Sequence, residues 1–187
     1  MKKLLLDKYI VKALSLCDKV KLSNEAIIGI TSYDMLAIDA DPHIAKEEAD
    51  DETYYIRGDM FKQLLKHTDK DVFITVSSII KEPKNELDTP RTMINIKATS
   101  TNSIDSVLLT DNAAKEFPDF NFQEMYNRYN YPEEGEHQFR YESDRFAIMS
   151  CLPKPIFQIA QYPDKRVFVL LYHYEHIKGV STITYEM

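Results

Sequence analysis

The sequence is poor in glycine and cysteine, and each shortage excludes a class of protein. Four glycines in 187 residues leave almost nothing from which to build the glycine-rich loops that hold nucleotide phosphates, so nucleotide-binding enzymes of that type are excluded. Two cysteines, Cys17 and Cys151, are too few for a disulfide framework and indicate a reducing compartment, which we take to be the cytoplasm. No stretch approaches the ~20 apolar residues that span a membrane, so no membrane partner is expected.

The start of the chain imitates a signal peptide, because a basic beginning precedes the short apolar run 4–6. Asp7 and Lys8 interrupt that run at once. The residue before Cys17 is Leu16, where a lipoprotein cleavage site needs a small side chain. The sequence therefore predicts that this segment belongs to the fold and is not a secretion signal.

Basic residues are outnumbered by acidic ones, 23 to 30, and the net charge is −7. This balance argues against a protein that binds nucleic acid over its whole surface, because phosphates are repelled by an acidic surface. A basic stripe on an acidic body remains compatible with it. The hydrophobic share of 44% and charged share of 28% are ordinary for a globular protein, and twelve tyrosines without tryptophan suggest a sheet-rich one.

The spacing of apolar residues predicts one unit three times over: a strand, a capped helix and three further strands. In the first unit the predicted strands cover 4–6, 26–31, 35–38 and 43–50. In the second they cover 54–56, 72–80, 93–98 and 104–109. In the third they cover 138–141, 155–160, 166–172 and 177–185. The helices are predicted to begin after the caps Asp7, Asp59 and Ser143 and to end near Val20, His67 and Leu152.

Two of the predicted helices each carry a line of lysines on the face opposite their apolar residues. On the first helix these are Lys8, Lys12 and Lys19, and on the second Lys62, Lys66 and Lys70. The third helix offers only Arg145 and Lys154. Such lines are typical of any solvated helix face, since lysine forms helices well, and equally of a basic surface that contacts phosphates without reading bases.

A short motif, Phe117-Pro118-Asp119-Phe120, follows the last strand of the second unit. Together with the order of elements it resembles the DNA sliding clamps, the family of the bacterial polymerase III beta subunit, the eukaryotic proliferating-cell clamp and the clamps of tailed phages. In bacterial clamps a Phe-Pro-Asp-Tyr type sequence commonly ends the second motif of a domain. The segment 55–119, with its helix at 62–65, resembles the second half of a clamp domain; 36–41 is similar to a strand of the family, and 139–185 to the last motif of a phage clamp.

The resemblance implies an α+β fold of repeated βαβββ motifs, with antiparallel sheets and the helices on one face. It implies a two-motif clamp-like domain over 1–120 and a linker with a third motif over 121–187. The family consists of processivity factors that bind double-stranded DNA without sequence preference, dock DNA polymerase or clamp-loader proteins, form homo-oligomers, and need no catalytic residue, metal or cofactor. The residues that the resemblance assigns to DNA are Lys8, Lys12, Lys19, Lys62, Lys66, Lys70 and Arg145.

Three motifs are an unusual number, because the family builds its rings from whole two-motif domains. The ending 182–187 also lacks the methionine-proline-rich tail that bacterial clamps use to bind partners. A closed ring is therefore not implied. An oligomer that completes half-domains across an interface, and a clamp-like protein that never encircles DNA, both stay open.

A metal-dependent enzyme is a second interpretation. Asp39, Asp41 and His43 alternate along one predicted segment, and side chains two apart on a strand share a face, where they could hold a divalent metal. His173 and His176 lie three apart, which places them on opposite faces of a strand and is wrong for a shared ion.

A protein-interaction module without DNA is a third interpretation. It depends on an aromatic group in the segment between the second and third units: Phe117, Phe120, Phe122, Tyr126, Tyr129 and Tyr131. These side chains could form an exposed docking surface, or they could cover the seam between the domain and the third motif.

Overall fold

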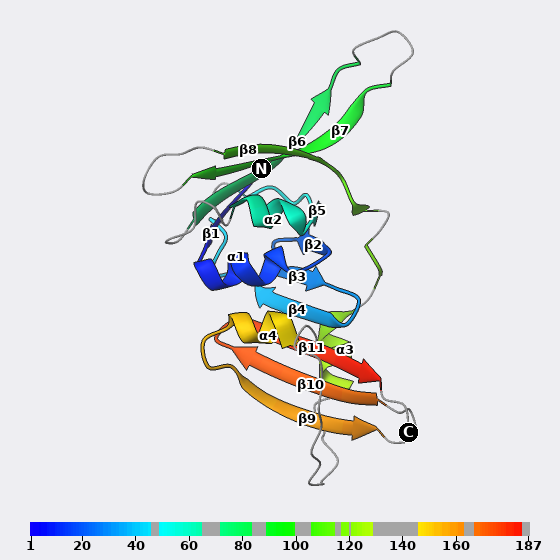
Figure 1. Cartoon of the computed structure of the whole chain (residues 1–187). Coiled ribbons are helices and arrows are strands. Elements are labelled where there is room, and N and C mark those ends of the chain that lie inside the picture. Colours follow the sequence, from blue (N-terminus) through cyan, green and yellow to red (C-terminus); the bar gives the residue numbers. More distant parts are fainter. Residues whose placement is uncertain are drawn as a thin grey trace.

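The computed structural model describes residues 1–45, 49–64, 72–83, 89–99, 106–114, 117–119, 121–128, 146–162 and 167–184. Within these residues antiparallel strands form two sheets, and short helices lie against them (Figure 1). The predicted α+β class with antiparallel sheets is therefore confirmed. No helix in this part of the chain is long and apolar enough to cross a membrane.

The elements of the first unit are β1 (Lys2–Leu6), α1 (Lys8–Ser15), β2 (Lys19–Leu22), β3 (Ala26–Ile30) and β4 (Asp34–Asp39). Those of the second are β5 (Tyr54–Arg57), α2 (Asp59–Leu64), β6 (Val72–Lys81), β7 (Arg91–Thr99) and β8 (Ser106–Asp111). After α3 (Phe122–Arg128), the third unit has α4 (Ala147–Cys151), β9 (Ile156–Tyr162), β10 (Val167–Tyr174) and β11 (Ile177–Thr184).

The first helix is capped as predicted but ends earlier. The Asp7 carboxylate accepts hydrogen bonds from the backbone N–H of Tyr9 at 2.7 Å and of Ile10 at 2.9 Å. The prediction that the helix runs to Val20 is wrong, because β2 begins at Lys19. In β2 lysines alternate with buried apolar residues, which is the period of a strand and not of a helix.

Of the predicted strand over 43–50, the described residues form no regular strand, and 46–48 lie outside the described residues. The chain turns at its start, with His43 N–H and Ile44 N–H both donating to the Ala40 carbonyl, at 2.9 and 3.0 Å. Beside β1, Ile44 forms an isolated bridge with Leu4, and the N–H groups of Leu5 and Ala45 donate to the carbonyls of His43 and Lys3, at 2.8 and 3.0 Å. The three strands that follow α1 are therefore β2, β3 and β4, and the predicted helix wrongly includes the first two residues of β2.

The other two caps differ from prediction as well. Asp59 is the first residue of α2, where its carboxylate pairs with Arg57 at 2.6 Å. The residue that precedes α4 is Phe146, which makes no capping hydrogen bond through its side chain. Ser143 and the predicted strand 138–141 lie outside the described residues. The six strands from β6 to β11 fall where the apolar alternation predicted them, within a few residues at each end.

The first two units exchange their leading strands. One sheet has the order β1-β6-β7-β8, so β1 of the first unit pairs with β6 of the second. The other has the order β5-β2-β3-β4-β11-β10-β9, so β5 of the second unit pairs with β2 of the first. The third unit joins the larger sheet where β11 pairs with β4, from Ile177 opposite Ile38 to Ser181 opposite Asp34. The larger sheet thus contains strands from all three units.

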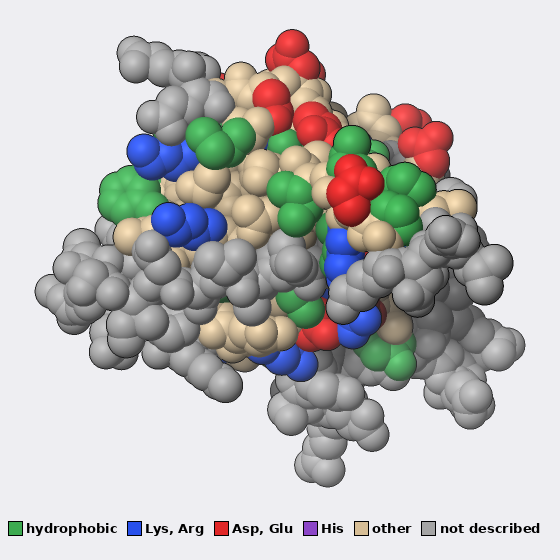
Figure 2. Space-filling model, turned by 90° about the horizontal axis from the view of Figure 1, so that it is seen from above, with side chains coloured by type: hydrophobic (Ala, Val, Ile, Leu, Met, Phe, Trp, Pro, Cys, Tyr) green, Lys and Arg blue, Asp and Glu red, His purple; other side chains and the backbone are tan. Residues whose placement is uncertain are grey.

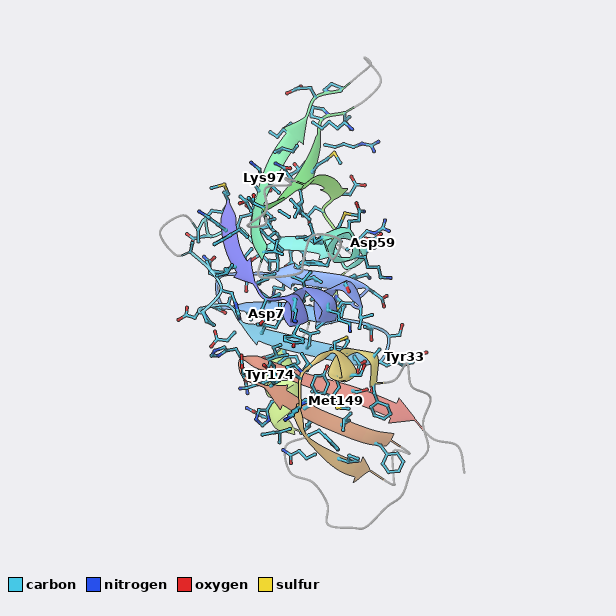
Figure 3. All side chains as sticks on the ribbon, turned by 60° about the vertical axis from the view of Figure 1, so that its left-hand side comes forward. Asp7, Tyr33, Asp59, Lys97, Met149 and Tyr174 are labelled. Carbon is cyan, nitrogen blue, oxygen red and sulfur yellow. The ribbon has the colours of Figure 1, made fainter. Side chains whose placement is uncertain are left out.

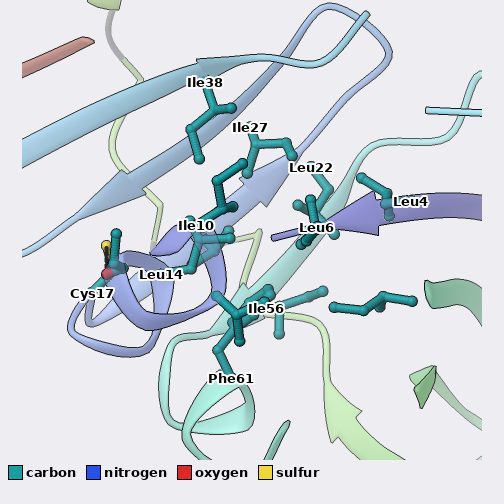
Figure 4. Close-up of a cluster of buried hydrophobic side chains, with 14 of the residues drawn as sticks. Leu4, Leu6, Ile10, Leu14, Cys17, Leu22, Ile27, Ile38, Ile56 and Phe61 are labelled. Carbon is teal, nitrogen blue, oxygen red and sulfur yellow. Dashed lines mark hydrogen bonds between the residues drawn. The ribbon is translucent and has the colours of Figure 1, made fainter. Parts of the chain in front are cut away.

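The main hydrophobic core lies between the two sheets and around α1 and α2 (Figure 4). From α1 it takes Ile10 and Leu14, from α2 Phe61 and Leu64, and from α4 Ile148. Figure 1 shows α1, α2 and α4 together on the near side of the larger sheet. The helix α3 lies on the opposite face, where Phe122 packs in a second, smaller cluster on β10 and β11 with Val169, Leu171 and Val180. The expectation that all helices share one face therefore holds for α1, α2 and α4 but not for α3.

Candidate nucleic-acid interface

The central element of the candidate interface is α1, which lies against α2 on one side and α4 on the other. Its apolar residues Ile10, Val11, Ala13 and Leu14 are buried against the sheets. Figure 3 shows Asp7 at the start of this helix and Met149 on the neighbouring α4. Because the apolar face is committed to the core, the polar face of α1 is the one left for a ligand.

Two lysines stand on that polar face. Lys8 and Lys12 are both exposed, and a spacing of four residues places them on the same side of the helix. The Lys8 ammonium lies 5.0 Å from the centroid of the Tyr9 ring. Burial raises the pKa of the Cys151 thiol on α4, and the positive charge of Lys12 opposes that shift. The charge of Lys12 is thus felt on the neighbouring helix.

On α2, Lys62 is exposed as well. Arg57 precedes α2 and is exposed, but its guanidinium donates to the Asp59 carboxylate at 2.6 Å. That ion pair offsets its charge locally, so Arg57 adds little to the field of this surface. In the described part of the chain, the neighbouring helices α1 and α2 thus carry three exposed lysines: Lys8, Lys12 and Lys62.

Of the remaining DNA-binding candidates, the structure describes only Lys19, which does not join this group. Lys19 lies on β2 and is half-buried, so it cannot continue the line of lysines along α1 as predicted. Lys66, Lys70 and Arg145 lie outside the described residues. Lys154, which follows α4 between two prolines, is exposed.

Most acidic side chains lie toward one border on the end of the molecule that carries β6, β7 and β8. Figure 2, which looks onto that end, shows them there, with the basic side chains in smaller groups elsewhere and one acidic group beside basic ones. Charge of the two signs is thus not evenly mixed over the surface. A chain with a net charge of −7 can in this way keep local surfaces that are not acidic.

The metal interpretation is contradicted by the geometry. The strand β4 ends at Asp39, and the chain then turns, so the alternation on which the interpretation rested does not exist. The Asp39 carboxylate accepts the backbone N–H of Asp41 at 3.2 Å, whereas the His43 Nδ1 lies 3.1 Å from the Leu5 carbonyl. Among the described residues no three His, Cys, Asp or Glu side chains are grouped so that they could hold a metal ion.

Two side chains of the aromatic segment are described well enough to compare with the two interpretations. Phe122 is buried in the cluster under α3, where it covers the seam with β10 and β11, so for this side chain the exposed-docking interpretation is wrong. Phe117 is half-buried, with its ring 5.6 Å from that of Tyr55 on β5, and it decides between neither interpretation. Phe120, Tyr129 and Tyr131 lie outside the described residues, and the side chain of Tyr126 is not described.

Two adjoining cavities lie beside α3, and the sequence pattern did not predict them. One of about 620 Å³ is lined by Ile28, Ala37, Asn121 and Phe122 among others. The second, of about 320 Å³, shares Ala37 and Phe122 and reaches Lys178 on β11. The local signal was Phe122 itself, an apolar residue that follows the Phe-Pro-Asp-Phe motif in a polar segment. Its position over the sheet depends on pairing between β4 and β11, which are distant in sequence.

Known proteins share this architecture. No protein-family model and no curated protein sequence matches the chain. All of the chain aligns with 99% of a chain from the structure of A. fulgidus PCNA with the C-terminal region of FEN-1 bound, at a TM-score of 0.54 and 9% identity. A second alignment joins 98% of the chain to 98% of a chain from the PCNA2–PCNA3 complex of Sulfolobus tokodaii, at a TM-score of 0.51 and 13% identity. The chain therefore has the fold of the PCNA sliding clamps.

Proposed function

We propose that this chain is a sliding-clamp-like processivity factor or accessory protein of DNA replication, which acts in the cytoplasm, binds duplex DNA without sequence preference and catalyses no reaction. The observation that carries the proposal is the exposed group Lys8, Lys12 and Lys62 on neighbouring helices of a clamp fold. The proposed DNA-binding set also includes Lys66, Lys70 and Arg145. It includes Lys19 too, which would contact DNA from strand β2 and not from a helix.

The proposed mechanism is electrostatic. Lysine ammonium groups on flexible stems contact phosphates and release condensed counterions, and such contacts are equivalent at every position along the duplex. Nothing in this group reads base edges, so no sequence would hold the protein in place. The acidic remainder of the chain would repel DNA from its other surfaces and favour binding through the helices.

Docking of DNA polymerase or clamp-loader proteins is the second part of the proposal. It is supported by the two cavities beside α3, which lie on the face opposite α1 and α2. Their lining combines apolar side chains such as Ile28 and Phe122 with polar groups such as Asn121 and Gln123. That composition suits a peptide segment with an apolar anchor and a few hydrogen-bonding groups. DNA and a docked protein would then occupy opposite faces.

We further propose that the chain works as a homo-oligomer, built from a two-motif domain over 1–120 and a third motif over 121–187. The exchange of β1 and β5 supports the first boundary, because neither of the first two units completes its sheet alone. Structural neighbours support assembly in general, since one of them was solved as a PCNA2–PCNA3 complex.

Charge reversal on the helices tests DNA binding. The variant Lys8→Glu, Lys12→Glu, Lys62→Glu is compared with wild type by fluorescence anisotropy on a labelled duplex of arbitrary sequence, across a series of salt concentrations. The slope of log K against log salt is negative, and each lost phosphate contact makes it shallower by about 0.9, so three lost contacts make it shallower by about 2.7. With equal affinities of the two proteins at 1 M salt, this corresponds at 0.1 M salt to a loss of affinity of about 500-fold.

A matched variant separates position from net charge. Lys81→Glu, Lys97→Glu, Lys178→Glu changes the charge equally, and all three lysines are exposed on strands rather than on the helices. We expect this control to keep most of the affinity and to unfold at the same temperature as the helix variant. Equal losses in both variants, or undiminished binding by the helix variant, would refute the proposed interface.

A further inference from the structure

The small sheet, formed by β1, β6, β7 and β8, buries one face in the core and turns the other away from it. Along the first half of β6 the buried residues Val72, Ile74 and Val76 alternate with residues that reach solvent. Side chains directly opposite each other in an antiparallel pair share a face, so the register identifies the members of this outer face. Its basic members are Lys3 and Lys97, on either side of Thr75, and Lys81, which lies opposite Arg91.

This outer face is basic although the chain as a whole is acidic, with a net charge of −7. The four strands contain a single acidic residue, Asp111 at the end of β8, and Glu82 follows β6 directly. Three of the four basic side chains are exposed, and Lys3 is half-buried. Figure 2, which looks onto this end of the molecule, shows basic and hydrophobic side chains next to one another. The outer face is thus an exception to the acidic surface and suits a polyanion.

Lys81 and Arg91 form a like-charge pair near the end of the β6–β7 hairpin, which projects beyond β1 and β8 (Figure 1). Like charges directly opposite each other on neighbouring strands are destabilising. No carboxylate among the described residues forms an ion pair with either side chain. An anion held between the two side chains would offset their repulsion, and a phosphate group is an anion that both lysine and arginine bind well.

An exposed aromatic ring lies beside the other two basic side chains. Phe73 is two residues from Thr75 along β6, about 7 Å away, and is 42% exposed, with Leu5 of β1 opposite it and 39% exposed. Among the described residues no aromatic ring packs against Phe73. Every base can stack on an aromatic side chain, but a duplex keeps its base faces inside the stack and only a single strand presents them. The ring therefore decides which kind of polyanion fits this face.

We propose that the outer face of the small sheet binds single-stranded nucleic acid, with a base stacked on Phe73 and phosphates held by the two basic pairs. The pair at Thr75 and the pair at Lys81 are six residues apart along β6, which is about 20 Å at ~3.3 Å per residue. An extended strand that follows β6 and β7 contacts both pairs. The inference goes beyond duplex binding through the helices, because it uses other residues on another face and neither activity depends on the other.

Fluorescence anisotropy on labelled oligothymidylate across a salt series tests the pair at Lys81. The variant Lys81→Gln, Arg91→Gln removes two phosphate contacts, and each makes the negative slope of log K against log salt shallower by about 0.7 for a single strand, or about 1.4 together. With equal affinities at 1 M salt, the variant should bind about 25-fold more weakly than wild type at 0.1 M salt. The control Lys8→Gln, Lys12→Gln changes the net charge equally on exposed helix positions and should keep the wild-type affinity for the single strand. Equal losses in the two variants, or an undiminished affinity of the β6–β7 variant, would overturn the inference.

An introduced tryptophan reports stacking directly, because the chain contains no tryptophan of its own. The indole emission of Phe73→Trp should be quenched when oligothymidylate binds, whereas Ile80→Trp, exposed on the other face of the same strand, should keep its emission. Phe73→Leu stays apolar but lacks the ring, and it should bind about 5- to 150-fold more weakly, the loss expected for one stacked base. Equal quenching at the two positions, or full affinity of Phe73→Leu, would contradict the proposal.

Competition identifies the class of ligand. Unlabelled duplex and polyglutamate should displace the labelled single strand only at concentrations far above that of an unlabelled single strand, and displacement by either at an equal concentration would overturn the inference. Duplex affinity is read separately from single-strand affinity. Single-strand binding without duplex affinity overturns the proposed function alone, and duplex affinity without single-strand binding overturns this inference alone.

Discussion

Gly179 lies at the junction of the third unit with the first, and replacing it with alanine should weaken that junction. It is on β11, opposite Tyr172 of β10 and Leu36 of β4. A Cβ atom at this position would lie 1.9 Å from the Tyr172 Cζ, 2.2 Å from its Cε2 and 2.3 Å from its hydroxyl oxygen. The Tyr172 ring therefore packs directly over the bare backbone of the glycine, and no side chain fits between them.

The magnitude follows from how far the ring would have to move. Carbon atoms in contact prefer a separation of about 3.5–4.0 Å, so the ring must shift by well over 1 Å in a core where it is buried. Overpacking of this kind costs about 1–3 kcal/mol, and the lower chain entropy of alanine in the unfolded state returns up to about 1 kcal/mol. We expect a net loss of about 2 kcal/mol in the free energy of unfolding. For a chain of this size that lowers Tm by about 4–8 °C.

Urea unfolding followed by circular dichroism measures the effect, and a double-mutant cycle identifies its cause. Tyr172→Leu removes the three atoms that the new Cβ would meet. In that background Gly179→Ala should cost at least about 1 kcal/mol less than in wild type, because neighbours that share one packing site are not additive. Equal costs in the two backgrounds, or an unchanged free energy of unfolding in Gly179→Ala, would refute the packing argument.

Two further predictions concern the first and second units. Asp7→Ala removes the acceptor for the N–H groups of Tyr9 and Ile10 and should lower the free energy of unfolding in urea by about 1 kcal/mol, whereas Asp7→Asn, which retains an acceptor oxygen, should cost only a few tenths. Burial raises the pKa of Tyr54 to about 12. Between pH 10 and 12 the unfolded chain therefore loses the phenol proton while the folded chain keeps it. The stability that this group contributes below pH 10 is lost as the pH rises. Above pH 10 the free energy of unfolding of Tyr54→Phe should therefore decline less steeply than that of wild type. At neutral pH the variant lacks the 2.6 Å hydrogen bond to Asp50 and should be about 1 kcal/mol less stable. Parallel declines in the two proteins would show that this phenol does not contribute to the alkaline loss of stability.

Features that depend on neighbours in sequence were predictable. The Asp7 cap needs only a carboxylate within reach of the N–H groups two and three residues later. The strands β6 to β11 are indicated by the alternation of apolar and polar residues along the chain. The exposure of Lys8, Lys12 and Lys62 follows from their helical spacing opposite apolar residues. Over a stretch as short as β2 the helical and strand periods of apolar residues both fit the sequence. The pattern therefore predicted a helix where β2 begins, and it wrongly placed Lys19 on the helix face.

The sequence alone thus determined the repeated unit, the fold class and a lysine-bearing helix face, because hydrogen-bonding reach and burial periodicity are local properties of the chain. Only the tertiary structure decided the exchange of β1 and β5, the pairing of β11 with β4 and the cavities beside α3. Lys2 shows the difference most directly: in the sequence it is a charge near the start of the chain. In the fold it is fully buried, with its ammonium donating to Asn24 and to the Asp50 carbonyl, each at 2.6 Å, and burial lowers its pKa. Those partners are 22 and 48 residues away, and a contact at that separation exists only once the whole chain has folded.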